Sequence, residues 1–333
     1  MIDDREKTPS VMIAGTGAYL PERIMTNAEL EKMVDTSDEW IVTRTGVRER
    51  RIAAAGEATS DMAIPAAKQA LQEAGLDAVD LDLIIVGTVT PDMIFPNTAS
   101  LVQSGIGATK ALCFDLSAAC SGFLYAQETA RGLLLSGLYD NALVIGADKM
   151  SVVTDWEDRG TCILFGDGAG AVVLKRTVTH RGIMATAVGA DGSLGDLLMI
   201  PGGGSRNPAS HASIDEHLHF VKMAGNNVFK HAVRCMTEAG RDALAKAGLT
   251  IDDVDWVIPH QANMRIVQAI SERVEIPLER FIINLDRLGN TTAATVPLAL
   301  NEGIRDGRIK RGDILLMIVF GGGFTWGATV VEY

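Results

Sequence analysis

Internal repetition limits the folds available to this chain of 333 residues more than any other feature does. Four short segments recur later in the chain, in the same order. The pairs are residues 70–76 with 243–249, 80–85 with 253–258, and 140–145 with 313–318, all 173 residues apart, and then 170–174 with 327–331 at a shorter offset. A single match of small residues would mean little, but four ordered matches indicate duplication of one unit.

Each copy reads as a helix that ends at a glycine and is followed by a short apolar strand. The apolar runs are continuous, which is typical of strands buried on both faces. We therefore predict an α/β fold with sheets covered by helices. We divide the chain into a first half, residues 1–176, and a second half, residues 177–333. Residues 177–222 show no counterpart, so we expect there a short strand and connecting loops.

The net charge of −12 argues against general binding to nucleic acid, which depends on distributed Lys and Arg side chains. The apolar run near the C-terminus, residues 314–320, is far shorter than the roughly 20 residues that cross a membrane. The first residues, MIDDREK, are acidic where a secretory leader would be basic and then apolar. We therefore expect no nucleic acid, membrane or secretory pathway.

The cysteines are scattered and show no metal-binding or disulfide spacing; they are Cys113, Cys120, Cys162 and Cys235. This usage predicts a cytoplasmic location. Three histidines, His211, His217 and His219, lie close together without supporting cysteines or carboxylates. We predict no metal site.

Cys120 lies where a predicted strand turns into a predicted helix, within the sequence DLSAACSGF of residues 115–123. Free N–H groups at a helix N-terminus stabilise a thiolate, so we predict a reactive cysteine with a lowered pKa. Small neighbours leave room for a substrate. The alternative is a buried, inert cysteine.

Two polar side chains follow strands of the second half. His260 directly follows the strand of residues 253–258 and its Pro259, and Asn290 lies in a turn that corresponds to the Cys120 turn. Ligands of open α/β folds bind beyond the carboxyl ends of strands. Either residue alone could be a helix cap or a structural hydrogen-bonding group. Beside them, the glycine run of residues 320–324 could present backbone N–H groups to an oxyanion or be a plain turn.

Together these motifs resemble the β-ketoacyl-acyl-carrier-protein synthase III family, the initiating condensing enzymes of bacterial type II fatty-acid synthesis. The resemblance runs from residues 15–17 to residues 322–327. Its most specific parts are residues 115–123, 159–170 (RGTCILFGDGAG), 260–263 (HQAN) and 289–291 (GNT). The resemblance implies the thiolase fold, in which duplicated βαβαβαββ halves form a five-layered αβαβα arrangement.

The resemblance also implies a reaction. Cys120 would take an acyl group from an acyl-CoA, with the backbone N–H groups of Cys120 and Gly322 as the oxyanion hole. Malonyl-acyl-carrier-protein would then lose CO2, and His260 and Asn290 would stabilise the enolate. The products would be a 3-oxoacyl-acyl-carrier-protein, CoA and CO2, and no cofactor or metal is required.

Further residues acquire roles only through this resemblance. The predicted CoA-binding residues are Trp40, Arg44, Arg159, Gly225, Phe229 and Asn263, with the adenine between Trp40 and Arg159. Taken alone, Trp40 reads as a surface packing residue and Arg44 as a salt-bridge partner. Phe95 and Met150 would shape the acyl pocket, with Phe95 entering it from the partner subunit of a homodimer.

The acyl carrier protein is strongly acidic in this family, and this chain is acidic as well. Docking therefore needs a local basic patch. We assign it to Lys230, Arg234 and Arg265. The alternative is an ordinary solvated helix face.

Related activities are less compatible with the sequence. A degradative thiolase would need a second cysteine in residues 320–325, an elongating synthase two histidines, and a plant-type polyketide synthase is usually longer. A synthase III-like acyltransferase or starter-unit condensing enzyme of a secondary-metabolite pathway remains the alternative. A catalytically silent acyl-binding protein would have no chemical need for Cys120, His260 and Asn290 together. We expect acetyl-CoA as the starter, although branched or medium-chain acyl-CoA stays open.

Overall fold

The computed structural model describes residues 9–179 and 182–333. The acidic opening of the chain, on which the expectation of no secretory leader rests, lies outside these residues. None of the helices in the described ranges is both long and apolar enough to cross a membrane.

The first half forms a five-stranded sheet in the order β1-β7-β6-β4-β5. Its strands are β1 (Ser10–Tyr19), β4 (Leu83–Gly87), β5 (Leu112–Leu116), β6 (Asn141–Asp148) and β7 (Gly168–Thr177). β4 is parallel to β5 and β6, while β7 runs antiparallel to β6 and β1. The central strands β4 and β6 are buried along almost their whole length, as their continuous apolar runs predict.

The second half repeats this arrangement in a four-stranded sheet of order β11-β12-β13-β8. Its strands are β8 (Gly182–Ala190), β11 (Trp256–Pro259), β12 (Ile314–Gly321) and β13 (Thr325–Glu332). The position of β5 is marked only by an isolated bridge between Val257 and Phe281. β11 is parallel to β12, and β13 is antiparallel to both of its neighbours.

The segment that we expected to lack a counterpart contains β8, which forms the edge of the second sheet as β1 forms the edge of the first. Residues 183–190 stand 173 positions after residues 10–17, yet only Ala14 and Ala187 are identical between them. We expected residues 177–222 to lack a counterpart and to hold a short strand among loops; for residues 182–190 this expectation was wrong. The backbone repeats where the side chains do not.

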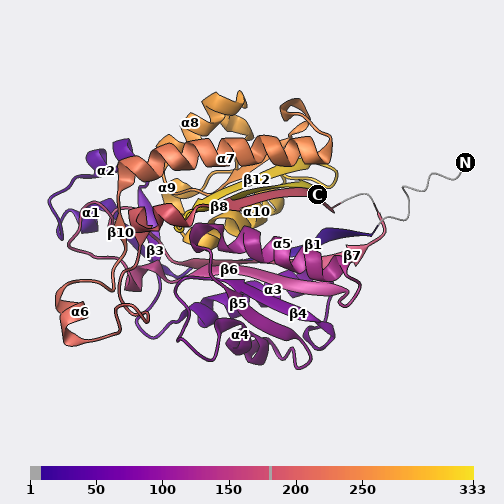
Figure 1. Ribbon diagram of the computed structural model, residues 1–333, viewed down its shortest axis with the longest axis horizontal. Helices are drawn as coiled ribbons and strands as arrows, with labels where there is room; N and C mark the ends of the chain where they lie inside the picture. Colours follow the sequence, from indigo (N-terminus) through magenta and orange to yellow (C-terminus); the bar gives the residue numbers. More distant parts are fainter. Residues whose placement is uncertain (1–8, 180–181) are drawn as a thin grey trace, which may run out of the picture.

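Helices complete five layers of the order αβαβα, as the resemblance implies (Figure 1). One outer layer holds α3 (Thr59–Ala74) and α4 (Thr98–Ile106), and the other holds α7 (Gly225–Ala247) and α8 (Met264–Val274). Between the two sheets lie α5 (Gly122–Leu135) and α10 (Thr295–Arg305). Both repeated helices, α3 and α7, end at a glycine in the left-handed conformation, Gly75 and Gly248.

The remaining elements gather at one end of the molecule, on the left of Figure 1, and several of them carry residues that line the cavity. They are β2 (Arg23–Thr26), α1 (Asn27–Leu30), α2 (Asp38–Thr45), β3 (Glu49–Ile52), β9 (Leu198–Met199), α6 (His211–Asp215), β10 (Lys222–Met223) and α9 (Leu285–Leu288). β2 pairs with β3, and β9 pairs with β10. Our proposed division of the chain at residue 176 falls at the end of β7.

Candidate active site

Cys120 lies in a single 3₁₀ turn, Ala119–Ser121, between β5 and α5. Ala119, just before it, adopts a left-handed backbone with φ of 47°. Such a conformation is uncommon for a residue with a side chain and forces a sharp change of chain direction. The cysteine is 8% exposed and reaches a large cavity.

The pKa of Cys120 differs from our expectation. Burial, together with the negative charge of the Asp148 carboxylate, raises the pKa of the thiol to about 12. The predicted lowering of this pKa was therefore wrong, because burial outweighs the favourable dipole of α5. In the free protein the group is a thiol.

His260 follows β11 directly, and its backbone N–H donates to the carbonyl of Ile318 on β12 at 2.7 Å. The imidazole is buried, and burial lowers its pKa to about 3, so that the ring is neutral at physiological pH. Among the described residues no group bonds to its Nδ1. A hydrogen on Nε2 avoids burying an unpaired N–H at Nδ1.

Asn290 is held by its backbone and by its side chain. Its N–H donates to Leu164 O at 2.8 Å, and its carbonyl accepts from Gly166 N at 3.1 Å. The backbone N–H of Thr292 donates to the side-chain Oδ1 at 2.9 Å. Because the oxygen is engaged in this bond, the amide nitrogen is the end of the side chain that remains for another acceptor.

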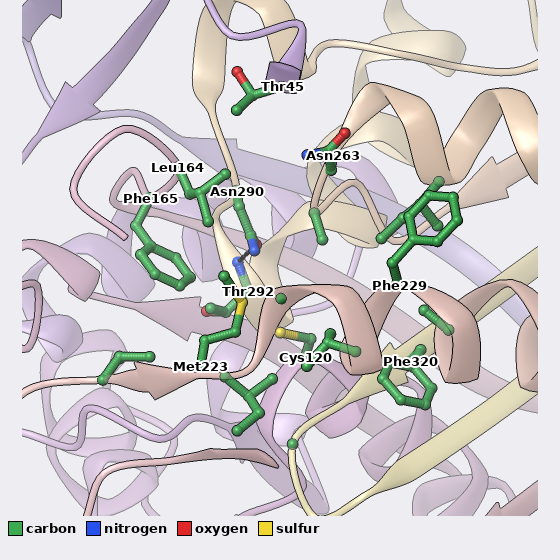
Figure 2. A pocket seen from close by; sticks show the side chains of 18 of the residues that line it. Thr45, Cys120, Leu164, Phe165, Met223, Phe229, Asn263, Asn290, Thr292 and Phe320 are labelled. Atoms are coloured by element: carbon green, nitrogen blue, oxygen red, sulfur yellow. Dashed lines mark hydrogen bonds between the residues drawn. The ribbon is translucent and has the colours of Figure 1, made fainter. Parts of the chain in front are cut away.

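The three side chains converge on one cavity of about 580 Å³. Figure 2 shows Cys120 and Asn290 there, with Thr292 beside them. Most of the wall is apolar, and it includes Leu164, Phe165, Leu198, Met223 and Phe320. A largely apolar cavity with a few convergent polar groups is typical of a site for a small organic substrate.

Two glycines at the end of β12, its last residue Gly321 and the following Gly322, bring the backbone against the Cys120 turn. A Cβ on Gly321 would stand 2.8 Å from the backbone nitrogen of Cys120 and 2.9 Å from that of Ser121. Only glycine allows this approach without movement of backbone atoms. The next residue, Gly322, lines the cavity.

The residues that we assigned to CoA lie around the mouth of the cavity, with one difference. Trp40, Arg44, Gly225, Phe229 and Asn263 line the cavity. Arg159 instead lies over the ring of Trp40, 4.8 Å from its centroid, and donates to the carbonyl of Asp35 at 2.7 Å.

Two arginine side chains lie against the ring of Trp40, since the Arg44 guanidinium also lies 4.6 Å from the ring centroid. An adenine placed between Trp40 and Arg159 would therefore have to displace Arg159. Asn263 caps α8 by accepting from Arg265 N at 2.9 Å, and it donates to Arg44 O at 3.0 Å. It thus ties α8 to α2 at the cavity mouth.

The two predicted acyl-pocket residues are found in different places. Met150 is buried and lines the cavity. Phe95 is 83% exposed, beside Ile94 at 87%, and does not line the cavity of its own chain.

The basic residues Lys230, Arg234 and Arg265 are exposed on α7 and α8. Arg265 lines the cavity mouth and lies over Phe229 at 5.8 Å. In the part of the chain that the structure describes, none of the three forms an ion pair with a carboxylate.

Sequence reasoning missed two residues beside the site, Asp148 and Thr292. Asp148 ends β6, is fully buried, and binds the turn that carries Thr292. Its place at the end of an apolar strand was the signal that could have singled it out. Within residues 9–179 and 182–333, no group of three or more His, Cys, Asp or Glu side chains could hold a metal.

Two family models match the chain. One is described as 3-oxoacyl-[acyl-carrier-protein] synthase III and matches residues 114–192. The other is described as the C-terminal part of the same synthase and matches residues 244–333.

Individual relatives are similar over nearly the whole chain. A β-ketoacyl-[acyl-carrier-protein] synthase III of Caldanaerobacter subterraneus subsp. tengcongensis is 52% identical over 96% of this chain and 97% of its own. The crystal structure of the synthase III of Aquifex aeolicus is 50% identical, with a TM-score of 0.90 over 97% of this chain and 100% of its own. The priming β-ketosynthase of the R1128 polyketide pathway has the same TM-score of 0.90 at 34% identity, over 98% and 96% of the two chains.

Proposed function

Because the chain belongs to the 3-oxoacyl-[acyl-carrier-protein] synthase III family, we propose that it initiates fatty-acid synthesis by joining an acyl-CoA starter to malonyl-acyl-carrier-protein. It is a condensing enzyme of the acyltransferase class, with the thiolase fold. The observation that carries the assignment of residues is the convergence of Cys120, His260 and Asn290 on one cavity.

In the first step the sulfur of Cys120 attacks the thioester carbonyl of acyl-CoA. A new thioester forms on Cys120, the bond to the CoA sulfur breaks, and the proton that Cys120 gives up ends on CoA. Because burial raises the pKa of the thiol, the sulfur carries its proton at neutral pH before the acyl-CoA binds. The backbone N–H groups of Cys120 and Gly322 receive the negative charge on the carbonyl oxygen.

In the second step malonyl-acyl-carrier-protein loses CO2, and the electron pair of the broken bond passes into a thioester enolate. His260 through Nε2–H and Asn290 through Nδ2–H donate to the enolate oxygen. A neutral donor serves here, since the buried imidazole does not take up a proton at physiological pH. The enolate carbon then attacks the acyl carbonyl on Cys120, and the bond to the Cys120 sulfur breaks. The thiolate that leaves takes up a proton from water, which restores the thiol.

The residues at the cavity mouth support a proposal for where CoA and the acyl carrier protein bind. Trp40, Arg44, Gly225, Phe229 and Asn263 surround the entrance for the CoA, and Arg159 lies on Trp40, where an adenine would stack. Arg265 lines the same cavity, and Lys230 and Arg234 are exposed on α7, which also carries the lining residue Phe229. Within the described residues none of these three cations forms an ion pair with a carboxylate, and we propose that they dock the acidic carrier protein. Neither step needs a metal or an organic cofactor.

A homodimer is part of the proposal. The edge strand β5 leaves Leu112 half exposed, and Phe95 and Ile94 are exposed side chains of the same half. A phenylalanine so exposed is more stable when it is covered. We propose that Phe95 enters the cavity of the partner subunit and, with Met150, limits the length of the acyl chain. We keep acetyl-CoA as the expected starter and the cytoplasm as the expected location.

The alternative is a starter-unit enzyme of secondary metabolism. It is favoured only by the similarity to the R1128 priming ketosynthase, at 34% identity. The synthases III of Caldanaerobacter subterraneus subsp. tengcongensis and Aquifex aeolicus are more similar, at 52% and 50% identity. We therefore prefer fatty-acid initiation.

A product assay tests the proposal. The protein is mixed with malonyl-acyl-carrier-protein and, in turn, acetyl-, branched and medium-chain acyl-CoA, and 3-oxoacyl-acyl-carrier-protein is followed by mass spectrometry. Product from acetyl-CoA, absent with Cys120→Ser, is the expected result. Acyl transfer without carbon–carbon bond formation would favour the acyltransferase alternative, and no reaction with any starter would refute the proposal.

A further inference from the structure

The repeat places corresponding residues of the two halves at two matching turns. The Cys120 turn, Ala119–Ser121, and the turn Thr292–Ala294 are 173 residues apart, and so are the strands β6 and β12. Both turns begin with a left-handed residue, Ala119 with φ of 47° and Thr292 with φ of 49°. Ala293 is therefore the counterpart of Cys120.

The last residue of each matching strand lies against one of these turns, and the two residues differ: one is a glycine and the other an aspartate. β12 ends with Gly321, whose missing side chain would stand 2.8 Å from the backbone nitrogen of Cys120. The backbone of Gly321 therefore packs directly against the Cys120 turn. β6 ends at the corresponding position with Asp148.

Asp148 reaches the second turn with its carboxylate. Its Oδ2 accepts from the hydroxyl of Thr292 and from the backbone nitrogen of Ala293, the latter at 3.2 Å. In the second half, the carboxylate of Asp148 thus binds the turn at the position where, in the first half, the backbone of Gly321 packs directly against the Cys120 turn. The turn that carries the reactive cysteine in the first half is, in the second half, held in place by hydrogen bonds to Asp148.

The other oxygen of Asp148 fixes the carboxylate to the segment that follows β4. Its Oδ1 accepts from Thr88 Oγ1 at 2.9 Å, from Val89 N at 2.8 Å, and from Thr90 N and Oγ1 at 3.2 and 2.9 Å. Asp148 is fully buried, and all six donors around it are uncharged. A buried carboxylate is tolerated only when its oxygens are bonded in this way.

The turn that Asp148 anchors also orients the amide of Asn290. The N–H of Thr292 donates to Asn290 Oδ1 at 2.9 Å, from a residue whose hydroxyl is bound by Asp148. We infer that Asp148 is a positioning residue for the condensation step: by holding the Thr292 turn, it keeps the amide nitrogen of Asn290 directed at the enolate oxygen. Cys120 acylation does not depend on this amide.

The inference rests on the proposed function, and its test separates the two half-reactions. The protein is loaded with acetyl-CoA, freed of excess reagent, and mixed with malonyl-acyl-carrier-protein. Mass spectrometry of the intact protein gives the rate of acetylation and then the rate at which the acetyl group is discharged. The variants are Asp148→Asn, Thr292→Val and, as a control of the same chemical kind, Thr88→Val.

Thr292→Val removes the hydroxyl that the Thr292 turn donates to Asp148 Oδ2, and Thr88→Val removes a hydroxyl donated to the other oxygen, Oδ1. We expect discharge to slow by at least about tenfold in both Asp148→Asn and Thr292→Val, with acetylation changed less than about threefold in Thr292→Val. Asp148→Asn also removes a negative charge that raises the pKa of Cys120, so acetylation of this variant should not slow. Thr88→Val should stay within about threefold in both steps, although its melting temperature falls as that of Thr292→Val does.

Three results would overturn the inference. The first is a Thr292→Val protein that is discharged at the wild-type rate. The second is a Thr292→Val protein in which acetylation and discharge slow by the same factor. The third is a Thr88→Val protein whose discharge slows as much as that of Thr292→Val. If Asp148→Asn does not fold, the two threonine variants decide the matter. Failure of the wild-type protein to take up acetyl at all would refute the proposed function instead.

Discussion

Replacement of Gly321 by alanine should disable acyl transfer while leaving the fold intact. The added Cβ would stand 2.8 Å from Cys120 N, 2.9 Å from Ser121 N and 3.0 Å from Ala118 O. Ordinary contacts begin at 3.4 Å, so β12 and the Cys120 turn must separate by about 0.6 Å. All three neighbours are backbone atoms, which no side-chain rotation can move away.

A separation of this size is enough to damage the proposed oxyanion hole. Its donors must lie about 2.7–3.1 Å from the oxyanion, and loss of one donor typically costs about 10²–10³ in rate. We therefore expect the acetylation rate to fall about 100-fold. Overpacking costs roughly 1–3 kcal/mol, so the melting temperature should fall by only a few degrees.

The assay is the rate of acetyl uptake from acetyl-CoA, measured by mass spectrometry, together with thermal melting. Gly132→Ala in α5 is the matched control, because nothing lies within 4 Å of its added Cβ and alanine favours a helix. It should acetylate at the wild-type rate and melt no lower. Acetylation of Gly321→Ala at the wild-type rate, with the melting temperature also unchanged, would refute the reasoning.

Three further predictions concern separate parts of the site. Alkylation of Cys120 by iodoacetamide should quicken about tenfold per pH unit from pH 7 to 10, because the pKa of the thiol is raised to about 12; a plateau near pH 8 would contradict this. Trp40→Ala should raise KM for acetyl-CoA about tenfold with little change in kcat, since a stacking partner for the base is lost; a lower kcat at unchanged KM would exclude that role. Arg265→Glu should raise KM for malonyl-acyl-carrier-protein and weaken its dependence on salt, and an unchanged KM would remove Arg265 from the docking patch.

Features that depend on local pattern could be predicted from the sequence. The glycine that ends α3 and the glycine that ends α7, followed by buried strands, revealed the duplication. The fold then followed, because two such units bury their apolar faces against each other. β8 escaped detection because a single identity, Ala14 with Ala187, links it to β1. Backbone geometry can persist when almost every side chain has changed.

Features that depend on burial could not be predicted in this way. The dipole of α5 favours a thiolate at Cys120, yet the pKa is raised, since the surrounding cavity wall removes water from the sulfur. The placement of Arg159 on Trp40 depends equally on distant segments, which meet only in the folded chain. The role of Asp148 could not be predicted from the sequence for the same reason. Its role follows from six donors in two segments that are far apart in sequence.

The most direct test of the central claim is to observe the acyl group on Cys120 and then its transfer. Protein mixed with acetyl-CoA is digested, the acetylated peptide is located by mass spectrometry, and malonyl-acyl-carrier-protein is added to a parallel sample. The account predicts one acetyl group, on Cys120, that disappears as 3-oxoacyl-acyl-carrier-protein and CO2 appear in equal amounts. An acetyl group on another residue, or one that malonyl-acyl-carrier-protein does not discharge, would contradict it.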